Sequence, residues 1–170
     1  TLRCARTVKG YTAEDEPATV LDGMFMSLTA NKYLEDKIFG AILSEEEIAD
    51  NASPALADIR RHMRIQAGKI RDSLQKVISS PAYSKYLREP IITIRDGRYV
   101  VPVKSEHKGD VPGLVHDVSA TGSTYFVEPM SAVNANNALR ELELKEKKEI
   151  ERILAELSSE AAAHRENIDL

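Results

Sequence analysis

The sequence predicts a mainly α-helical α+β fold, in which two long antiparallel helices flank a small antiparallel β module. Two long stretches carry apolar residues at helical spacing, and β-rich segments lie only between them. Charged residues make up 29% of the 170-residue chain and aromatic residues only 5%. This composition suits long solvated helices better than an all-β sandwich.

Residues 1–53 are predicted to form a helical core portion built from short pieces. Apolar residues recur at helical spacing over 19–28 and again over 31–39, where Gly40 ends the pattern. The polar residues 12–17 are expected to form a loop. Residues 41–49 are expected to form a tiny hairpin around an acidic turn.

Residues 54–90 are predicted to contain the first long helix. Ser53 can cap this helix, and Pro54 suits its first position. Apolar residues then recur at steps of three and four, which is the pattern of a coiled-coil seam. The seam consists of Leu56, Ile59, Met63, Ala67, Ile70, Leu74 and Val77. Pro81 interrupts the pattern, and a shorter helical piece is expected to follow as far as Arg88.

Residues 91–130 are predicted to form the β module. Asp96-Gly97 lies between two β-rich segments and favours a type I′ hairpin, because Gly tolerates a positive φ. Pro102 has no N–H to donate, so its strand is expected to be an edge strand or to carry a bulge. A polar loop leads to two further strands, at 113–118 and 123–127.

Residues 131–170 are predicted to form the second long helix, with Ser131 as its cap. The helix returns antiparallel to the first, so the two can pack together. Its seam is apolar except at Glu146 and His164. The seam consists of Leu139, Leu142, Glu146, Ile150, Ile153, Leu157, Ala161, His164 and Ile168.

Charge is distributed unevenly along the chain. The overall net charge of −4 argues against a uniformly basic nucleic-acid binder. Residues 54–90 nevertheless carry a net charge of +5, whereas residues 131–170 carry −3. Two interpretations remain open: the two long helices are complementary in charge, or the basic segment faces nucleic acid.

The sequence contains no motif of an autonomous enzyme. A Walker motif, H-E-x-x-H, C-x-x-C and G-x-S-x-G are all absent, and a single cysteine, Cys4, excludes a disulfide framework. His116 and Asp117 are adjacent on a strand and are expected to point to opposite faces, so we expect Asp117 and Ser119 to satisfy the following turn instead. We assign no catalytic, cofactor-binding or metal-binding residue.

No run of about 18 apolar residues and no apolar N-terminal segment is present. The sequence therefore predicts neither a membrane helix nor a signal peptide, and a cytoplasmic protein without membrane contact is expected.

The candidates for nucleic-acid contact are basic residues of the β module. They are Arg95 and Arg98 beside the hairpin turn, and Lys104, His107 and Lys108 at the following loop. Mobile or forked donors at an exposed tip suit phosphate oxygens. Acidic residues are interleaved with them, so the local field is expected to be uneven.

Long ordered motifs resemble those of one bacterial family. They read EPIITIRDGRYVVPVK at 89–104, GLVHDVSATGSTYFVEP at 113–129, IADNASPALADIRR at 48–61, VNANNAL at 133–139 and EIERIL at 149–154. The family is the Smr-tailed, recombination-suppressing group of MutS paralogues. The resemblance implies a core domain, paired lever helices and a clamp-like β module between them.

The resemblance also implies a longer parent protein. That parent has a dimerising ABC-type ATPase domain, which uses ATP and Mg, and a C-terminal Smr endonuclease domain. Neither is recognised in this chain, so we expect a non-catalytic fragment of a protein that acts as a homodimer.

Members of the family are similar in binding branched DNA and suppressing recombination, and some act on stalled or collided ribosomes. The partner implied first is therefore branched or duplex DNA. A ribosome- or protein-docking arm, with rRNA as a contact, is the alternative, and a purely structural spacer is a third interpretation.

Overall fold

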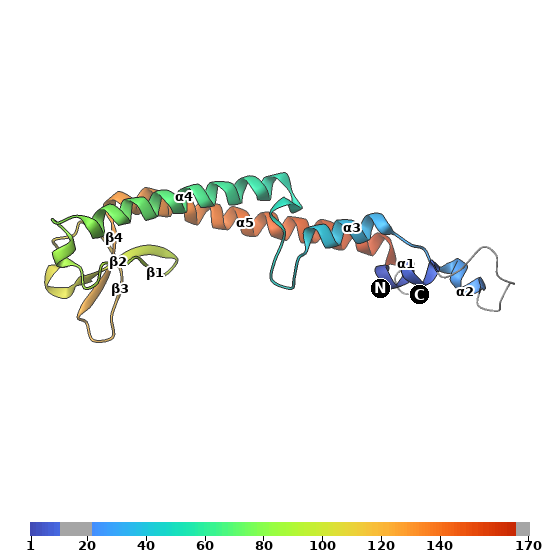
Figure 1. Cartoon of the computed structure of the whole chain (residues 1–170), viewed down its shortest axis with the longest axis horizontal. Coiled ribbons are helices and arrows are strands. Elements are labelled where there is room, and N and C mark those ends of the chain that lie inside the picture. The colour runs from blue at the N-terminus through green and yellow to red at the C-terminus, as the bar shows by residue number, and fades with distance from the viewer. Residues whose placement is uncertain (11–21, 166–170) are drawn as a thin grey trace. The chain divides into compact units, whose positions relative to one another are not determined.

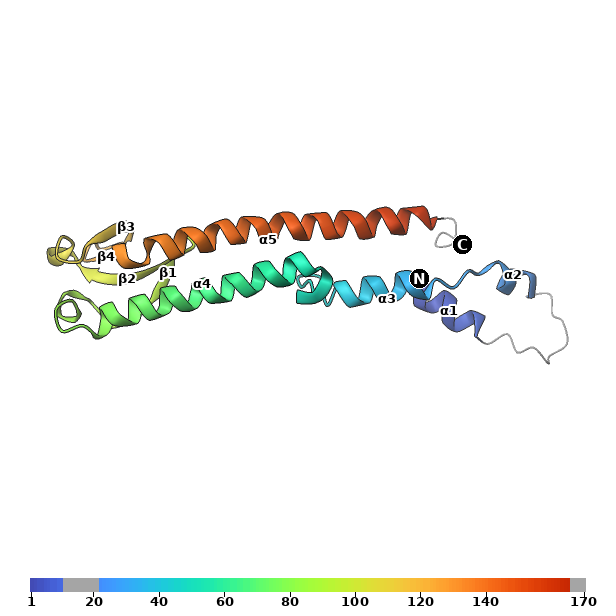
Figure 2. The ribbon, with the colours of Figure 1, turned by 90° about the horizontal axis from the view of Figure 1, so that it is seen from above.

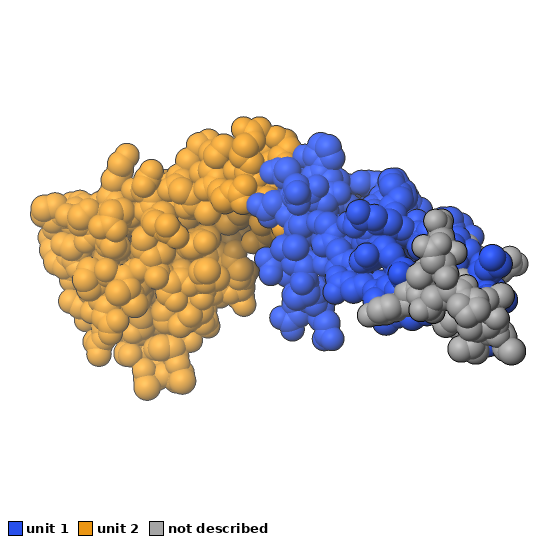
Figure 3. Space-filling view, turned by 45° about the vertical axis from the view of Figure 1, so that its right-hand side comes forward, with its two compact units in different colours: residues 1–57, 148–170 blue, residues 58–147 orange. Residues whose placement is uncertain are grey.

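The computed structural model describes residues 1–10 and 22–165 of the chain. Most of these residues are helical, and four strands form one antiparallel sheet, which confirms the predicted α+β fold (Figure 1). The chain divides into two compact units, residues 1–57 with 148–170 and residues 58–147, which Figure 3 shows in different colours. Each unit is described by itself.

The first unit is helical. It contains α1 (Leu2–Lys9), α2 (Asp22–Ser27), α3 (Lys32–Ala41), the 3-10 turn η1 (Asp50–Ala52), the start of α4 (Pro54–Ser79) and the C-terminal half of α5 (Met130–Ala163). The side chain of Asn31 caps α3 by accepting a hydrogen bond from the backbone N–H of Leu34 at 3.0 Å. The helix continues one residue beyond the predicted stop at Gly40.

The tiny hairpin predicted after α3 is present. Ile42 and Ile48 form an antiparallel bridge, and the backbone N–H of Ala49 donates to the carbonyl of Ala41 at 2.8 Å. Ile42 and Ile48 pack against a small apolar core, which is formed by Ala41, Leu56, Ile153 and Leu157. The predicted loop at 12–17 and the seam position Ile168 lie outside the described residues.

The start signal of the first long helix is confirmed. The helix α4 begins at Pro54, and the backbone N–H of Leu56 donates to the Ser53 hydroxyl at 3.0 Å. It ends at Ser79, before Pro81. The helical piece expected after it is a single 3-10 turn, η2 (Ser84–Tyr86).

The second unit contains the sheet. Its strands are β1 (Thr93–Arg95), β2 (Arg98–Lys104), β3 (Gly113–Val118) and β4 (Thr124–Pro129), in the order β1-β2-β4-β3, with the 3-10 turn η3 (Ser105–His107) after β2. The predicted hairpin is present: Arg95 pairs with Arg98, and Asp96 and Gly97 have φ of 50° and 72°. Positive φ at both central residues is the requirement of a type I′ turn.

The prediction that the strand of Pro102 is an edge strand or carries a bulge is wrong, because β2 lies between β1 and β4 and pairs with β4 in unbroken register over residues 101–104. Pro102 stands opposite Phe126 of β4, and its carbonyl accepts a hydrogen bond from the backbone of Arg88 at 2.8 Å. The N and C=O of one strand residue point to the same side, so the missing N–H faces away from β4. On that side β1 pairs only as far as Val100, so no ladder bond is lost.

The prediction that Ser131 caps the second long helix is also wrong, because α5 begins at Met130. The helix follows β4 directly, and the backbone N–H of Met130 is bonded to the carbonyl of Pro112 at 3.0 Å. A backbone bond of the sheet therefore satisfies the first helical donor. The Ser131 hydroxyl instead accepts a hydrogen bond from Ser73 of α4 at 2.9 Å.

Within the second unit, α4 and α5 run antiparallel and side by side (Figures 1 and 2). One face of the sheet packs on them, and the core consists of Ile70, Leu74, Leu87, Val101, Val103, Val111, Val127, Ala132 and Leu139. Glu146, a polar position of the predicted seam, forms an ion pair with Arg60 of α4 at 2.6 Å. This pair accords with the charge complementarity inferred for the two helices.

Across residues 1–10 and 22–165, no helix has the length and apolar character needed to cross a bilayer.

Gly113 is the position where the sheet tolerates no side chain. A Cβ there would lie 2.2 Å from the carbonyl oxygen of Glu128 and 2.7 Å from a methyl group of Val127. We predict that Gly113→Ala lowers the free energy of unfolding by about 2 kcal/mol, because the backbone of β4 must move. Gly109→Ala is the matched control, since nothing lies within 4 Å of its added Cβ. Urea unfolding followed by circular dichroism measures both, and equal stabilities would contradict the close approach.

Candidate nucleic-acid interface

The five predicted contact residues all lie in the second unit, but the fold separates them into two groups. Lys104, His107 and Lys108 gather near η2 and η3. Arg95 and Arg98 lie on β1 and β2 and are held by carboxylates.

Two members of the first group, His107 and Lys108, contact aromatic rings, and Lys104 contacts the neighbouring backbone. The ammonium of Lys104 donates to the backbone carbonyl of Lys85 at 2.9 Å. The rings of Tyr86 and His107 have centroids 4.8 Å apart, and the Lys85 ammonium lies 4.9 Å from the Tyr86 ring. Cations at this distance are attracted by the electron-rich ring face.

The Lys108 ammonium lies 5.1 Å from the ring of Tyr125, which pairs with Val103 across β2 and β4. These contacts join six residues into a surface that we call the basic-aromatic patch: Lys85, Tyr86, Lys104, His107, Lys108 and Tyr125. Lys85 and Lys108 are exposed, and the other four are half-buried. The patch offers cationic donors for phosphate and aromatic rings for bases.

Three members of the patch were not among the predicted contacts: Lys85, Tyr86 and Tyr125. Lys85 lies in the basic segment 54–90 and is followed by Tyr86. A lysine beside an aromatic residue in a basic segment indicates nucleic-acid contact, so these two residues could have been predicted from the sequence. Lys85 and Tyr86 come close to the loop through the isolated bridge between Leu87 and Val103, and Tyr125 does so through the pairing of β4 with β2. No local pattern predicts either contact.

Two acidic side chains border the patch beside His107. The Nδ1 of His107 lies 2.8 Å from a carboxylate oxygen of Asp110. The pKa of Glu106 lies below its ordinary value, chiefly because its carboxylate accepts a hydrogen bond from its own backbone N–H. Asp110 therefore offsets positive charge beside His107, and Glu106 offsets it near both His107 and Lys104.

Arg95 and Arg98 lie on the face of the sheet opposite the helices. The Nε of Arg95 is 3.1 Å from Asp117, and its guanidinium lies 4.1 Å from the Phe126 ring. Arg98 pairs at 3.1 Å with Glu128, whose side chain is fully buried. The Arg95 side chain is partly exposed, whereas Arg98 neutralises the buried carboxylate of Glu128. Contact of either arginine with nucleic acid stays a prediction.

The expectation that His116 and Asp117 point to opposite faces is wrong. The pairing of β3 with β4 shifts between Val115 and Asp117, so His116 is the extra residue of a β-bulge. His116 is hydrogen-bonded to Glu128, and Asp117 pairs with Arg95 on the same face. They have separate partners, and the carboxylate of Asp117 also accepts a hydrogen bond from the backbone of Val118.

The expected role of Ser119 in the turn is confirmed, because its hydroxyl accepts a hydrogen bond from the backbone N–H of Thr124 at 3.1 Å. In the part of the chain that the structure describes, no group of three or more His, Cys, Asp or Glu side chains is placed to hold a metal ion.

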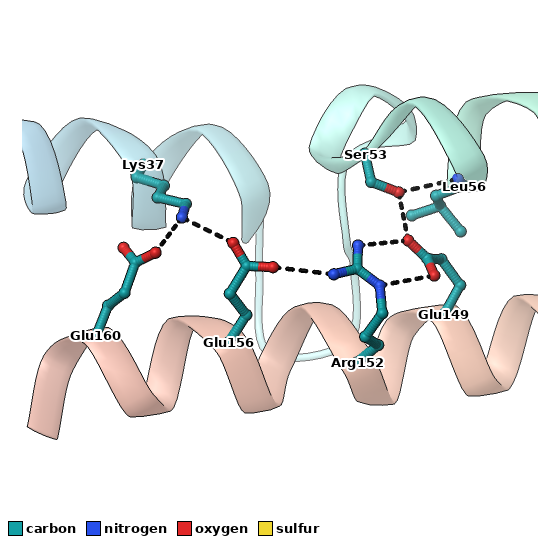
Figure 4. A network of polar contacts seen from close by, with 7 residues as sticks. All are labelled: Lys37, Ser53, Leu56, Glu149, Arg152, Glu156 and Glu160. Carbon is teal, nitrogen blue, oxygen red and sulfur yellow. Dashed lines mark hydrogen bonds and ion pairs between the residues drawn. The ribbon is translucent and has the colours of Figure 1, made fainter.

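A second cluster of polar residues lies in the first unit (Figure 4). Glu149 accepts hydrogen bonds from Ser53 at 2.7 Å and from Arg152, which also bonds Glu156 at 2.9 Å. Lys37 then bonds both Glu156 and Glu160. The cluster borders a hollow of about 280 Å³, which is lined in part by Lys37, Arg152 and Glu156. These three side chains are paired with one another or with other members of the cluster. These hydrogen bonds and ion pairs connect α3, the start of α4 and α5. The cluster is therefore interpreted as a structural contact and not as a ligand site.

This cluster shifts the pKa of its members. Hydrogen bonds from Arg152 and then Ser53 lower the pKa of Glu149 from 4.5 to about 2. Hydrogen bonds to Glu160 and Glu156 raise the pKa of Lys37 above its ordinary value.

Comparison with known proteins shows relatives over nearly the whole chain. Proteins named endonuclease MutS2 from Ruminiclostridium cellulolyticum and Acetivibrio thermocellus are 52% and 50% identical over 95% and 94% of the chain. One from Alkaliphilus oremlandii is 46% identical over 99%. The chain spans about a fifth of the length of these curated relatives. No protein-family model matches it. The resemblance found in the motifs is thereby confirmed.

The low pKa of Glu149 predicts a pH-dependent contribution to stability. Because the ionised form is favoured in the fold, the contribution is present above pH 4.5 and is lost as the pH falls from 4.5 to about 2. We expect Glu149→Gln to lower the melting temperature at pH 7, with the difference from the unmodified chain shrinking across that window. Glu151→Gln, at an exposed neighbouring position, is the control. A difference that stays constant with pH would contradict this assignment.

The pairing of Arg98 with Glu128 predicts a structural role. We expect Arg98→Ala to cost about 2 kcal/mol or more in unfolding free energy, because it removes one partner of a buried carboxylate. Adding Glu128→Gln should recover part of this loss, since the buried charge is then removed. A double-mutant cycle in urea measures the coupling. Additive effects of the two substitutions would show that the pair is not coupled.

Proposed function

We propose that this chain, which matches one segment of the endonuclease MutS2 family, is a non-catalytic core, lever and clamp segment that contacts nucleic acid through its β module. In this proposal α4 and α5 are the lever helices and the four-stranded sheet is the clamp. The observation that supports it most is the basic-aromatic patch, where three lysines and two tyrosines gather at one surface.

The proposed partner is branched or duplex DNA. Lys104 and Lys108 offer ammonium groups to phosphate oxygens, and Arg95, which is partly exposed beside Asp117, can add a forked donor. Such contacts position a nucleic acid without reading its sequence.

The relatives' name and the motif resemblance extend the proposal to the whole protein. We propose that this protein is a homodimeric endonuclease that suppresses recombination, and that ATP, Mg and strand cleavage belong to residues outside this chain. The segment then supplies contact and transmits motion along its helices.

A protein-docking arm, for example on a ribosome, is the second candidate. Exposed apolar side chains on the outer strands of the sheet favour it: Ile94 is 53% exposed, Leu114 48% and Val115 46%. Binding of this kind would depend little on salt, whereas phosphate contacts release counterions and weaken steeply with salt.

The proposed DNA contact predicts a charge-specific loss of binding. Fluorescence anisotropy with a labelled four-way junction and a linear duplex, at about 50 and about 200 mM salt, measures affinity and its salt slope. We expect the double variant Lys104→Ala and Lys108→Ala to weaken binding and to reduce the slope by about 2, or roughly one per lost phosphate contact.

The matched control removes the same charge elsewhere in the second unit, through Lys145→Ala and Lys147→Ala on exposed positions of α5. An equal loss in both double variants would mean that overall charge, and not the patch, governs binding. Binding that is insensitive to salt would favour the protein-docking candidate.

A further inference from the structure

The rings of Tyr86 and Tyr125 are built into the surface in the same way. Each packs against the core of the second unit, which fixes its position. Each also has a lysine ammonium over its ring, Lys85 at 4.9 Å and Lys108 at 5.1 Å. Because both lysines are exposed and flexible, the ring faces that they cover lie at the surface.

An aromatic ring that packs on the core and has a lysine ammonium over its outer face is suited to stack a nucleic-acid base. The base can take the place of the ammonium on the ring, and the displaced lysine can then bind the phosphate of the same strand. His107, whose ring lies 4.8 Å from that of Tyr86, adds a third aromatic surface.

Base pairing decides which nucleic acids can use such a surface. Bases inside a duplex are already stacked on both faces, so their faces are closed to a protein ring. Unpaired bases of single strands can be splayed onto aromatic side chains. The patch therefore favours unpaired nucleotides over an intact duplex.

The charges around the rings fit a single strand. The ammonium of Lys104 donates one N–H to the carbonyl of Lys85, and its two other N–H groups can bind phosphate. Asp110 pairs with His107, so phosphates are expected on the lysines and not beside His107.

We propose that the basic-aromatic patch binds unpaired nucleotides of single-stranded DNA or RNA, with bases stacked on Tyr86 and Tyr125 and phosphates held by Lys85, Lys104 and Lys108. The inference rests on the proposed nucleic-acid contact and names the strand type that this surface takes. Unpaired strand, such as that exposed at a branch, is then bound beside η2 and η3.

Leucine substitutions test the stacking while retaining apolar packing. The probes are a labelled 20-nucleotide DNA strand, an RNA strand of the same sequence and a blunt DNA duplex, each with the full chain at low salt. We expect Tyr86→Leu and Tyr125→Leu each to weaken single-strand binding about tenfold, with duplex binding changed by less than about twofold. Tyr83→Leu is the matched control, because Tyr83 also packs against the core but no lysine lies over it among the described contacts.

A second measurement needs no variant. The chain has 6 Tyr and no Trp, so its intrinsic fluorescence reports tyrosine directly. Stacking of bases on two tyrosines should quench this emission when a single strand saturates the unmodified chain, and blunt duplex should quench it less.

The outcomes separate the two proposals. Equal weakening of single strand and duplex by the leucine variants, or no quenching at saturation, overturns the stacking inference while the lysine variants still test the nucleic-acid contact. Binding of none of the three probes overturns both. Tighter binding of the RNA strand supports the inference with RNA as the source, and tighter binding of the DNA strand supports it with DNA.

Discussion

The packing of one sheet face on α4 and α5 is the constraint on which the second unit depends. Val101, Val103 and Val127 are buried against Ile70 and Leu74. Since side chains alternate along a strand, fixing these valines on the helix side assigns every other side chain of β2 and β4 to a face. This assignment places Arg98 and Glu128 on the face away from the helices, where they form an ion pair.

The two groups of predicted contact residues are separated by their partners, because Arg98 and Lys104 are on the same side of the alternation along β2 and only Arg98 meets a buried carboxylate. Arg98 and Glu128 fall on the face away from the helices, where they meet each other and His116. A guanidinium that neutralises a fully buried carboxylate is costly to divert to phosphate, because the carboxylate would be left with fewer partners. In the described contacts the ammonium groups of Lys85 and Lys108 lie over aromatic rings and do not neutralise a buried carboxylate. The lysines are therefore the stronger donors for a ligand.

Features set by neighbouring residues were predictable, and features set by sheet order were not. Ser53 and Pro54 start α4, and Asp96-Gly97 forms its hairpin, because caps and tight turns depend on a few adjacent residues. The error at Pro102 arose because the place of β2 in the sheet depends on β4, about 20 residues further along the chain. The error at His116 arose because the β-bulge depends on the register between β3 and β4. In the candidate site, the loop lysines were predicted, whereas Lys85 was missed because the Lys104 ammonium meets its carbonyl across 19 residues of sequence.

The outer edge of β3 bears on the choice between nucleic acid and protein as partner. An exposed strand with apolar side chains would ordinarily invite pairing with a second chain. Here the bulge at His116 interrupts the strand, and the carboxylate of Asp117 takes the backbone N–H of Val118 at 2.8 Å. Both devices make this edge a poor template for an added strand. At the β3 edge a protein partner would have to bind through side chains alone, whereas the basic-aromatic patch already offers the two kinds of group that a nucleotide requires.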